Sequence, residues 1–266
     1  MSTTRSYHDV CGIARALDVI GERWALLIVR ELLLGPQRFS ELRQALTNTS
    51  ANVISDRLRE LEARGVIQRR KLAPPAASSV YELTLWGRQL EPILVRLGEW
   101  GIQAPTPAPP NVLSPTSALI YLRSCARPDP MAAPTAVRIN LDNQTWTARA
   151  DHGELIITAT YTRDVDAEVR TDPWTFSALI GNATALQAAI AGATVTINGD
   201  PSAARRLLLE VDNRGDEHAP VTSWLAVGGS PPTGQPVPAK VWRGEPLRSR
   251  ERRWEEGQRE FPDPRW

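Results

Sequence analysis

The stretch that decides the fold runs from Arg38 to Thr84 and reads RFSELRQAL (38–46), TNTSANVISDRLRELEARG (47–65), VIQRRKLAPPAASS (66–79) and VYELT (80–84). A short amphipathic segment, a polar turn and a longer amphipathic segment that ends at a glycine predict two successive helices. The β-rich runs on either side of the Pro/Ala/Ser loop predict a basic hairpin. Helix, turn, helix and hairpin in this order indicate a winged helix-turn-helix, which places its second helix in the major groove of DNA.

The second predicted helix has a polar face that is suited to reading bases. With Ile54 at the centre of the buried face and about 100° per residue, the outward residues are Asn52, Ser55, Asp56 and Arg59. Asparagine pairs with adenine, and arginine pairs with guanine or grips phosphate. An ordinary solvated helix face has the same composition. The short helix before this segment and the basic hairpin after it favour the DNA-reading interpretation.

Three consecutive cations, Arg69, Arg70 and Lys71, lie on the first predicted strand of the hairpin. Successive strand residues alternate between faces, so the three cannot all reach one surface. Their position after the candidate reading helix favours phosphate contacts, which supply affinity without sequence specificity. The full set of residues that we expect to contact DNA is Arg38, Ser50, Asn52, Ser55, Arg57, Arg59, Arg69, Arg70 and Lys71.

Helical periodicity also flanks this stretch. Apolar residues between Cys11 and Leu34 recur every three or four positions, and Gly21 divides them into two predicted helices. Thr49 or Ser50 is the expected N-terminal cap of the reading helix. Residues 85–100 form a further amphipathic helical segment.

Two Pro-rich tracts divide the 266 residues into parts. Residues 104–115 contain five prolines and read as a semi-rigid linker. We therefore expect a winged helix-turn-helix domain for DNA binding and dimerisation at 1–103, a second domain at 116–227, and a Pro/Gly-rich, charged tail at 228–266. Two domains also agree with a usual size of about 150 residues each.

Charge and composition narrow the classes of protein. Residues 1–101 carry 14 Lys/Arg and 11 Asp/Glu, whereas residues 102–225 carry 9 and 13, as expected for a basic DNA-binding head and an acidic body. We expect a cytoplasmic protein without a membrane segment, because no apolar run approaches about 18–20 residues. Two cysteines and three scattered histidines predict no metal site, and the absence of nucleophile and phosphate-loop motifs predicts no cofactor and no enzyme.

The second domain mixes predicted strands and helices, so the whole chain is α+β. Turn signals at Asp142-Asn143 and His152-Gly153 separate β-rich runs, which predicts an antiparallel sheet with helices on one side. The predicted strands are 136–141, 145–150, 154–161, 165–171 and 193–198, and the predicted helices are 117–127, 173–180, 182–191 and 201–209.

The head resembles the HxlR-type winged-helix regulators, which are close to the MarR group, over roughly residues 8–101. The motifs are CGI (11–13), AL (16–17), IG (20–21), RW (23–24), RFSEL (38–42), LRELE (58–62), GVI (65–67), YELT (81–84), Gly87 and residues 97–100. The resemblance implies a homodimer, formed through the N- and C-terminal helices of the head, on a palindromic operator in double-stranded DNA. The wing loop, APPAASS (73–79), is shorter and less aromatic than usual, so we do not expect groove contacts from its tip.

Residues 115–215 resemble sterol-carrier-protein-2 domains. The matching motifs are PWTF (173–176), LIG (179–181), Leu186, AI (189–190), VTINGD (195–200) and ARRLL (204–208). The resemblance implies a tunnel between sheet and helices that takes an apolar small molecule. The residues that we expect to bind this ligand are Trp146, Trp174, Phe176, Leu179 and Ile190, of which most would otherwise be ordinary core.

Cys11 lies where some HxlR-type regulators carry a redox-sensing cysteine. A reactive thiol needs a lowered pKa and access to solvent. The head has no second cysteine to resolve a sulfenic acid. The expectation is a small buried core residue, with thiol sensing as the alternative.

Together these features predict a sequence-specific DNA-binding regulator, most simply a repressor, whose second domain senses an apolar small molecule. One alternative is a lipid or ligand carrier whose winged-helix head serves only for dimerisation. The other is a redox-sensing regulator that acts through Cys11.

Overall fold

The computed structural model describes residues 6–72, 78–105, 111–160 and 162–211. The tail predicted at 228–266 and most of the wing loop lie outside the described residues. Within them, the head comprises α1 (Gly12–Ile20), α2 (Ala25–Leu32), α3 (Phe39–Ala45), α4 (Ala51–Ala63), β1 (Ile67–Lys71), β2 (Ser79–Leu83), α5 (Leu85–Arg88) and α6 (Glu91–Gly101). No helix in the described ranges is long and apolar enough to cross a membrane.

Local chemistry sets the bounds of α4, the predicted reading helix. The Ser50 side chain accepts a hydrogen bond from the Val53 N–H at 3.3 Å, so Ser50 rather than Thr49 is the N-terminal cap. Gly65 follows the helix with φ of +75°, a left-handed conformation that ends helices and that glycine adopts without strain. The helix therefore begins and ends where the sequence predicts.

The predicted helical segment at 85–100 is two helices in the structure. Pro92 lies at the start of α6, where its missing N–H and fixed φ are tolerated, whereas the interior of one continuous helix would exclude it. Gly87 in α5 lies close to the preceding chain, because a Cβ at this position would lie 2.0 Å from the Val66 carbonyl oxygen. This approach fixes the short helix α5 against the base of the hairpin.

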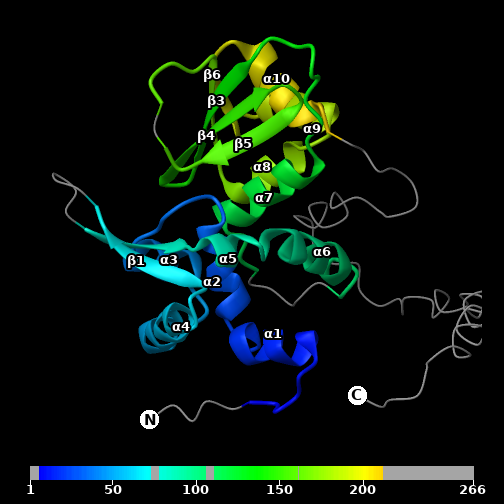
Figure 1. The fold of residues 1–266 in the computed structure, drawn as a ribbon. Coiled ribbons are helices and arrows are strands. Elements are labelled where there is room, and N and C mark those ends of the chain that lie inside the picture. Colours follow the sequence, from blue (N-terminus) through cyan, green and yellow to red (C-terminus); the bar gives the residue numbers. More distant parts are fainter. Residues whose placement is uncertain (1–5, 73–77, 106–110, 161, 212–266) are drawn as a thin grey trace, which may run out of the picture. The chain divides into compact units, whose positions relative to one another are not determined.

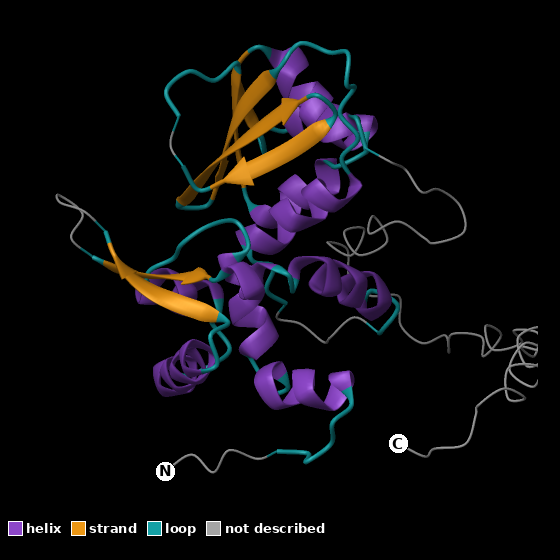
Figure 2. Ribbon diagram, in the orientation of Figure 1, coloured by secondary structure: helices purple, strands orange, loops and turns teal. Residues whose placement is uncertain are grey.

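A single apolar core holds the head together. The fully buried residues of α2, α3 and α4 that form it include Ile28, Leu32, Leu42, Ile54, Leu58 and Leu61. Strand β1 pairs with β2 in an antiparallel hairpin, and Gln37 adds two backbone hydrogen bonds to Tyr81. The two strands project from the helices as a twisted ribbon (Figure 2). The order of these elements is that of a winged helix-turn-helix.

The apolar faces of α1 and α6 are not covered in the described chain. On α1 and just before it, Val10 is 92 % exposed and Ile13 73 % exposed. On α6, Ile93 is 55 % exposed and Trp100 71 % exposed. Neither helix contains a buried residue. The two helices therefore present large apolar side chains to solvent in the described chain.

The second part of the chain is a sheet covered on one side by helices (Figure 1). Its helices are α7 (Pro115–Cys125), α8 (Pro173–Leu179), α9 (Ala183–Ala191) and α10 (Pro201–Leu209). Its strands are β3 (Thr135–Leu141), β4 (Gln144–Asp151), β5 (Glu154–Thr158), β6 (Ala167–Thr171) and β7 (Thr196–Gly199), in the spatial order β5-β4-β3-β6-β7.

The prediction of an antiparallel sheet is wrong for one pair of strands, because β3 and β6 are parallel. Strand β5 ends at Thr158, and the next residues return across the sheet before β6 begins. The Thr147 hydroxyl donates to the Thr160 carbonyl oxygen at 2.8 Å, which holds this crossover against the polar face. The return lets β6 enter beside β3 in the same direction, so the sheet is mixed.

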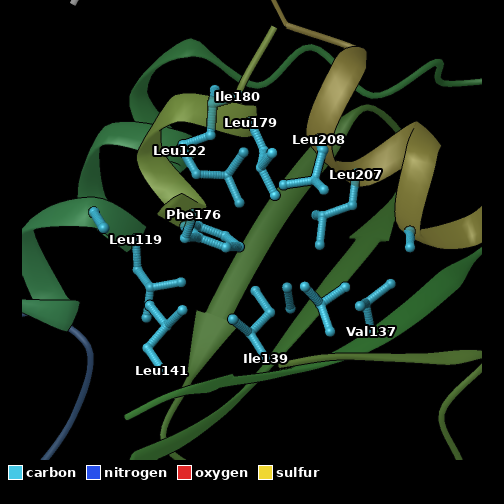
Figure 3. Close-up of a cluster of buried hydrophobic side chains, with 14 of the residues drawn as sticks. Leu119, Leu122, Val137, Ile139, Leu141, Phe176, Leu179, Ile180, Leu207 and Leu208 are labelled. Atoms are coloured by element: carbon cyan, nitrogen blue, oxygen red, sulfur yellow. The ribbon is translucent and has the colours of Figure 1, made fainter. Parts of the chain in front are cut away.

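The other face of the sheet carries the core. Val137, Ile139 and Leu141 of β3 point toward Phe176 of α8 and Leu208 of α10 (Figure 3). All five residues are almost completely buried. Buried apolar residues alternate with polar residues along the second half of β3. One face of the sheet therefore packs against the helices, and the other face is polar and lies toward solvent.

Helix α7 joins this core to the head. The Ser114 hydroxyl, which also caps α7, donates to the Glu31 carboxylate of α2 at 2.9 Å. Glu31 is 1 % exposed and forms an ion pair with Arg30 at 2.5 Å. Leu34, at the end of the α2 segment, belongs to the core cluster of the second part. The described residues of the head and of the second part accordingly belong to one compact unit.

Candidate nucleic-acid interface and ligand-binding residues

The outward face of α4 carries the residues that sequence analysis assigned to base reading. Asn52, Asp56 and Arg59 are exposed, and Ser55 is half-buried at the flank of the same face. Arg59 forms an ion pair with Asp56 one turn earlier, with a side chain that stays 74 % exposed. Ile54 on the opposite face of α4 is completely buried in the core of the head. The helix is therefore held in place, and Asn52, Asp56 and Arg59 form a fixed polar row that faces solvent.

Arg57, a predicted DNA contact, pairs with two carboxylates of the chain. Its guanidinium lies 3.4 Å from the Glu22 carboxylate and 2.5 Å from that of Glu60, and its side chain is 18 % exposed. Arg57 therefore lies on the flank of α4 that faces the α1–α2 connection, away from Asn52 and Arg59. Two carboxylate partners leave it little capacity to bind a phosphate.

The three cations of β1 are divided between the two faces of the hairpin. Arg69 stacks over the Tyr81 ring at 5.9 Å, and Lys71 shares its face and is exposed. Arg70 points to the other face, where its Nε and Nη2 donate to the Glu82 carboxylate at 3.0 Å. The hydrogen bonds from Arg70 and then from Gln68 hold the pKa of Glu82 below its usual range. The hydrogen bond to Glu82 in turn raises the pKa of Arg70.

The remaining predicted contacts lie at the two helix starts. Arg38 is exposed at the N-terminus of α3, and its backbone N–H donates to the Glu41 carboxylate. Ser50 is exposed at the start of α4. Sequence reasoning did not select Arg43, an exposed cation on the solvent face of α3. Its position in α3, the first helix of the helix-turn-helix, is the sequence feature that could have identified Arg43 as a further candidate.

Cys11 is exposed, so the expectation of a buried core residue is wrong. It is the N-terminal cap residue of α1. The nearby backbone N–H groups of Ile13 and then Ala14 lower the pKa of its thiol, because these dipoles stabilise the thiolate. Cys125 is half-buried, and its thiol donates to the Tyr121 carbonyl oxygen at 3.2 Å.

The five predicted ligand-binding residues do not line one cavity. Trp146, Phe176 and Leu179 are at most 3 % exposed and belong to the packed core, whereas Trp174 and Ile190 are 38 % and 45 % exposed on the surface. Asp172 caps α8 and fixes Pro173 and Phe176 toward the sheet, which turns Trp174 outward. A pocket does exist in this part of the chain, but other residues line it.

Among the described residues, no group of three or more His, Cys, Asp or Glu side chains is arranged to hold a metal ion. The polar face of the sheet instead carries an ion-pair network. Glu168 accepts hydrogen bonds from Arg138 at 3.2 Å, Asn140 at 2.9 Å and Arg170 at 3.0 Å. Those from Arg170 and then Arg138 hold the pKa of Glu168 below its usual range. These contacts connect β3 and β6 and stabilise the parallel pair.

The head is similar to known proteins. The family model described as HxlR-like helix-turn-helix matches residues 19–107. The uncharacterized HTH-type transcriptional regulator YvaP of Bacillus subtilis is 43 % identical over 89 residues, which are 34 % of this chain and 82 % of YvaP. The HTH-type transcriptional regulator YodB of the same organism is 31 % identical over 88 residues, or 33 % of this chain and 79 % of YodB.

Solved structures match the same region. The redox regulator HypR in its reduced form has 35 % sequence identity and a TM-score of 0.32, and the match covers 34 % of this chain and 90 % of HypR. The reduced form of YodB from B. subtilis has 28 % identity and a TM-score of 0.33, covering 38 % of this chain and all of that structure.

Proposed function

The chain belongs to the HxlR-like helix-turn-helix family and is a DNA-binding transcriptional regulator, and we propose that it acts as a dimeric repressor on a palindromic operator. The observation that carries the proposal is the row Asn52, Asp56 and Arg59 on the outward face of α4. In this role Asn52 and Arg59 contact base edges, with Ser55 at their flank. Arg38, Ser50, Arg69 and Lys71 contact phosphates.

The exposed apolar faces of α1 and α6 support dimerisation through these helices. A second copy would cover the exposed apolar side chains of both helices, Ile13, Leu17, Ile93, Leu97 and Trp100. Each Å² of apolar surface that is removed from water stabilises the dimer by about 25 cal/mol. A two-fold dimer then places the two reading helices about 34 Å apart, one turn of DNA. Trp100→Glu is expected to shift the protein to monomers in analytical ultracentrifugation.

We further propose that the second part of the chain senses an apolar small molecule. Helix α7 supports a path for coupling, because Ser114 at its start contacts the buried Glu31 of α2. Arg123 of α7 also forms an ion pair with Glu91 of α6. A ligand changes DNA affinity if it binds the DNA-competent and the incompetent arrangement of these helices with different affinity.

Fluorescence anisotropy with the promoter next to the chain's own gene tests the proposal, at about 50–100 mM salt where phosphate contacts are strong. Arg59→Ala is expected to weaken binding to this DNA far more than binding to random DNA. Arg149→Ala removes an exposed arginine of β4 and serves as the charge-matched control. Absence of any DNA binding contradicts the repressor proposal and favours the carrier alternative, and equal losses on both DNAs reduce Arg59 to a phosphate contact.

A second candidate function is oxidant sensing through Cys11, which its exposure at the start of α1 and its lowered thiol pKa favour. Its thiolate attacks one oxygen of a peroxide, forms a sulfenic acid and releases hydroxide. The charge and size of the modified side chain then alter α1, a helix of the proposed dimer surface. An oxidant response of DNA binding that is unchanged in Cys11→Ser excludes this function.

A further inference from the structure

The outward face of α4 carries a carboxylate among the residues assigned to base reading. At about 100° per residue, Asn52, Asp56 and Arg59 lie within about 60° of one another around the helix axis. The opposite side of the helix is buried, with Leu58 and Leu61 each 1 % exposed. The side chain of Asp56 is 50 % exposed. Asp56 therefore lies near the middle of the face that approaches DNA in the proposed function.

DNA repels a lone carboxylate, because it carries one negative charge per about 1.7 Å of its axis. Asp56 is not alone, since the Arg59 Nη2 donates to its Oδ1 from one turn further along the helix. An exposed pair of this kind contributes little to the stability of the fold. Its effect is on position, because it holds the guanidinium of Arg59, a side chain that is 74 % exposed, over the polar row of α4.

Both members of this pair keep hydrogen-bonding capacity for a ligand. A guanidinium has five N–H groups, and Asp56 takes one of them, so Arg59 retains two adjacent donors for another partner. In the part of the chain that the structure describes, the second carboxylate oxygen of Asp56, Oδ2, accepts no hydrogen bond. Side by side, the two residues therefore present two donors and one acceptor.

A G·C base pair presents the complementary pattern in the major groove. Guanine offers two acceptors, N7 and O6, and the N4 amino group of the paired cytosine is a donor beside O6. An A·T pair places a donor, the adenine N6 amino group, between the acceptors N7 and O4, so the second donor of Arg59 would meet another donor there. A phosphate offers acceptors alone and would repel Asp56. Among these partners, the G·C pair is the one that satisfies both side chains.

We propose that Asp56 and Arg59 act as one unit that reads a G·C base pair in each half of the operator, with Arg59 at the guanine and Asp56 at the cytosine. Asp56 also positions Arg59, because it draws the guanidinium away from the phosphates and toward the base edges. The inference rests on the proposed function, which places α4 in the major groove. It adds a second residue to the contact of Arg59 and assigns the identity of one base pair in the operator.

Selection of binding sites by the full chain, from a duplex library with about 20 randomised base pairs, tests the proposal. The wild-type chain is expected to select a G·C pair at one position of each half-site, with a preference of roughly fivefold or more over the other base pairs. Asp56→Asn and Arg59→Ala are each expected to remove most of this preference and to leave the other positions of the site unchanged. An Asp56→Asn chain that keeps the wild-type preference at every position overturns the proposal.

Glu62→Gln is the matched control, because it makes the same charge change on an exposed residue of α4 about 120° around the axis from Asp56. Both variants are expected to bind random DNA more tightly, since each removes a negative charge that faces phosphates. Asp56→Asn alone is expected to lower the base preference. Identical preferences in the two variants overturn the proposal, because Asp56 then acts through its charge alone. The thermal midpoint of Asp56→Asn is expected to stay within about 2 °C of the wild-type value.

Two modified bases in the selected duplex test the contacts one at a time. N4-methylcytosine still pairs with guanine but carries a methyl group in place of the N4 hydrogen in the groove, and 7-deazaguanine lacks the N7 acceptor. N4-methylcytosine is expected to weaken binding of the wild-type chain by at least about fivefold and to have little effect on Asp56→Asn. 7-Deazaguanine is expected to behave in the same way toward the wild-type chain and Arg59→Ala. Penalties that are absent from the wild-type chain, or that persist in the variants, overturn the assigned contacts.

The outcomes also separate this proposal from the proposed function. A wild-type chain that selects no sequence contradicts operator recognition, and the G·C contact with it. Selected sites in which no G·C position depends on Asp56 contradict the G·C contact alone, and operator recognition stands.

Discussion

Arg70 and Glu82 face each other across the hairpin with their side chains 3.0 Å apart, so one of the three cations of β1 is already paired within the protein. The partner strand supplies Tyr81 to Arg69 on the other face. The run of three positive residues therefore presents two charges, those of Arg69 and Lys71, on one face of the hairpin, and the charge of Arg70, paired with Glu82, on the other.

Glu82→Gln is expected to increase affinity for random DNA several-fold, because it releases the Arg70 guanidinium to a phosphate. The slope of log affinity against log salt should become steeper by about 0.9 for one added phosphate contact. Anisotropy titrations over a salt series measure both values. Glu154→Gln on the exposed start of β5 makes the same charge change away from the wing, and an equal increase there would mean that only net charge matters.

Ser50→Ala is expected to lower the free energy of unfolding by about 1 kcal/mol, since the Val53 N–H loses its acceptor at the start of α4. Denaturant unfolding followed by circular dichroism measures the change. Thr49→Ala alters the neighbouring residue, which is not the cap, and should cost less. The reverse order of the two losses would contradict the cap that the structure assigns.

Phe176→Ala is expected to destabilise the second part of the chain by about 3–5 kcal/mol, because Phe176 is 0 % exposed in the centre of the core. Trp174→Ala, two residues away on the outward side of α8, should cost less than about 1 kcal/mol. Thermal unfolding of the two variants compares them directly. Similar losses would show that Trp174 is covered in solution by another surface.

Alkylation of Cys11 by iodoacetamide should reach its half-maximal rate at a lower pH than alkylation of cysteine in a short peptide. The backbone N–H groups of Ile13 and Ala14 favour the thiolate, and lowering the pKa of an acid raises its ionised fraction at a given pH. Mass spectrometry of tryptic peptides follows Cys11 and Cys125 separately. Cys11→Ser should leave only the slower, half-buried thiol, and identical pH profiles for Cys11 and the peptide would contradict the lowered pKa.

The head could be predicted closely from its sequence because local signals and global packing agree there. Ser50, Gly65 and the spacing of Ile54, Leu58 and Leu61 define α4 without knowledge of its neighbours. The pairing of Arg70 with Glu82 and of Arg57 with Glu22 depends on the register of the hairpin and on the approach of two helices. Periodicity along the chain does not specify either.

The second part was predicted well in its elements and less well in their arrangement. Turn residues mark the hairpins of β3, β4 and β5, but nothing local marks the return that makes β6 parallel to β3. The aromatic motif at Trp174 and Phe176 was assigned to one site, although two residues that are two positions apart on a helix lie about 200° apart around its axis and so point in nearly opposite directions. Five of the fourteen residues that line the pocket of the second part are alanines, which carry no recognisable signal in the sequence.

The parallel pairing of β3 with β6 also has a consequence for the order of folding. The helices and the hairpin of the head have all been made by Gly101, whereas the centre of the sheet waits for β6 and its edge for β7, which ends at Gly199. At a synthesis rate of about 5–20 residues per second, the interval between these points is roughly 5–20 s. Pairing of distant segments is also slow in itself. A nascent chain is therefore expected to carry a folded winged helix on the ribosome several seconds before it carries a closed sheet.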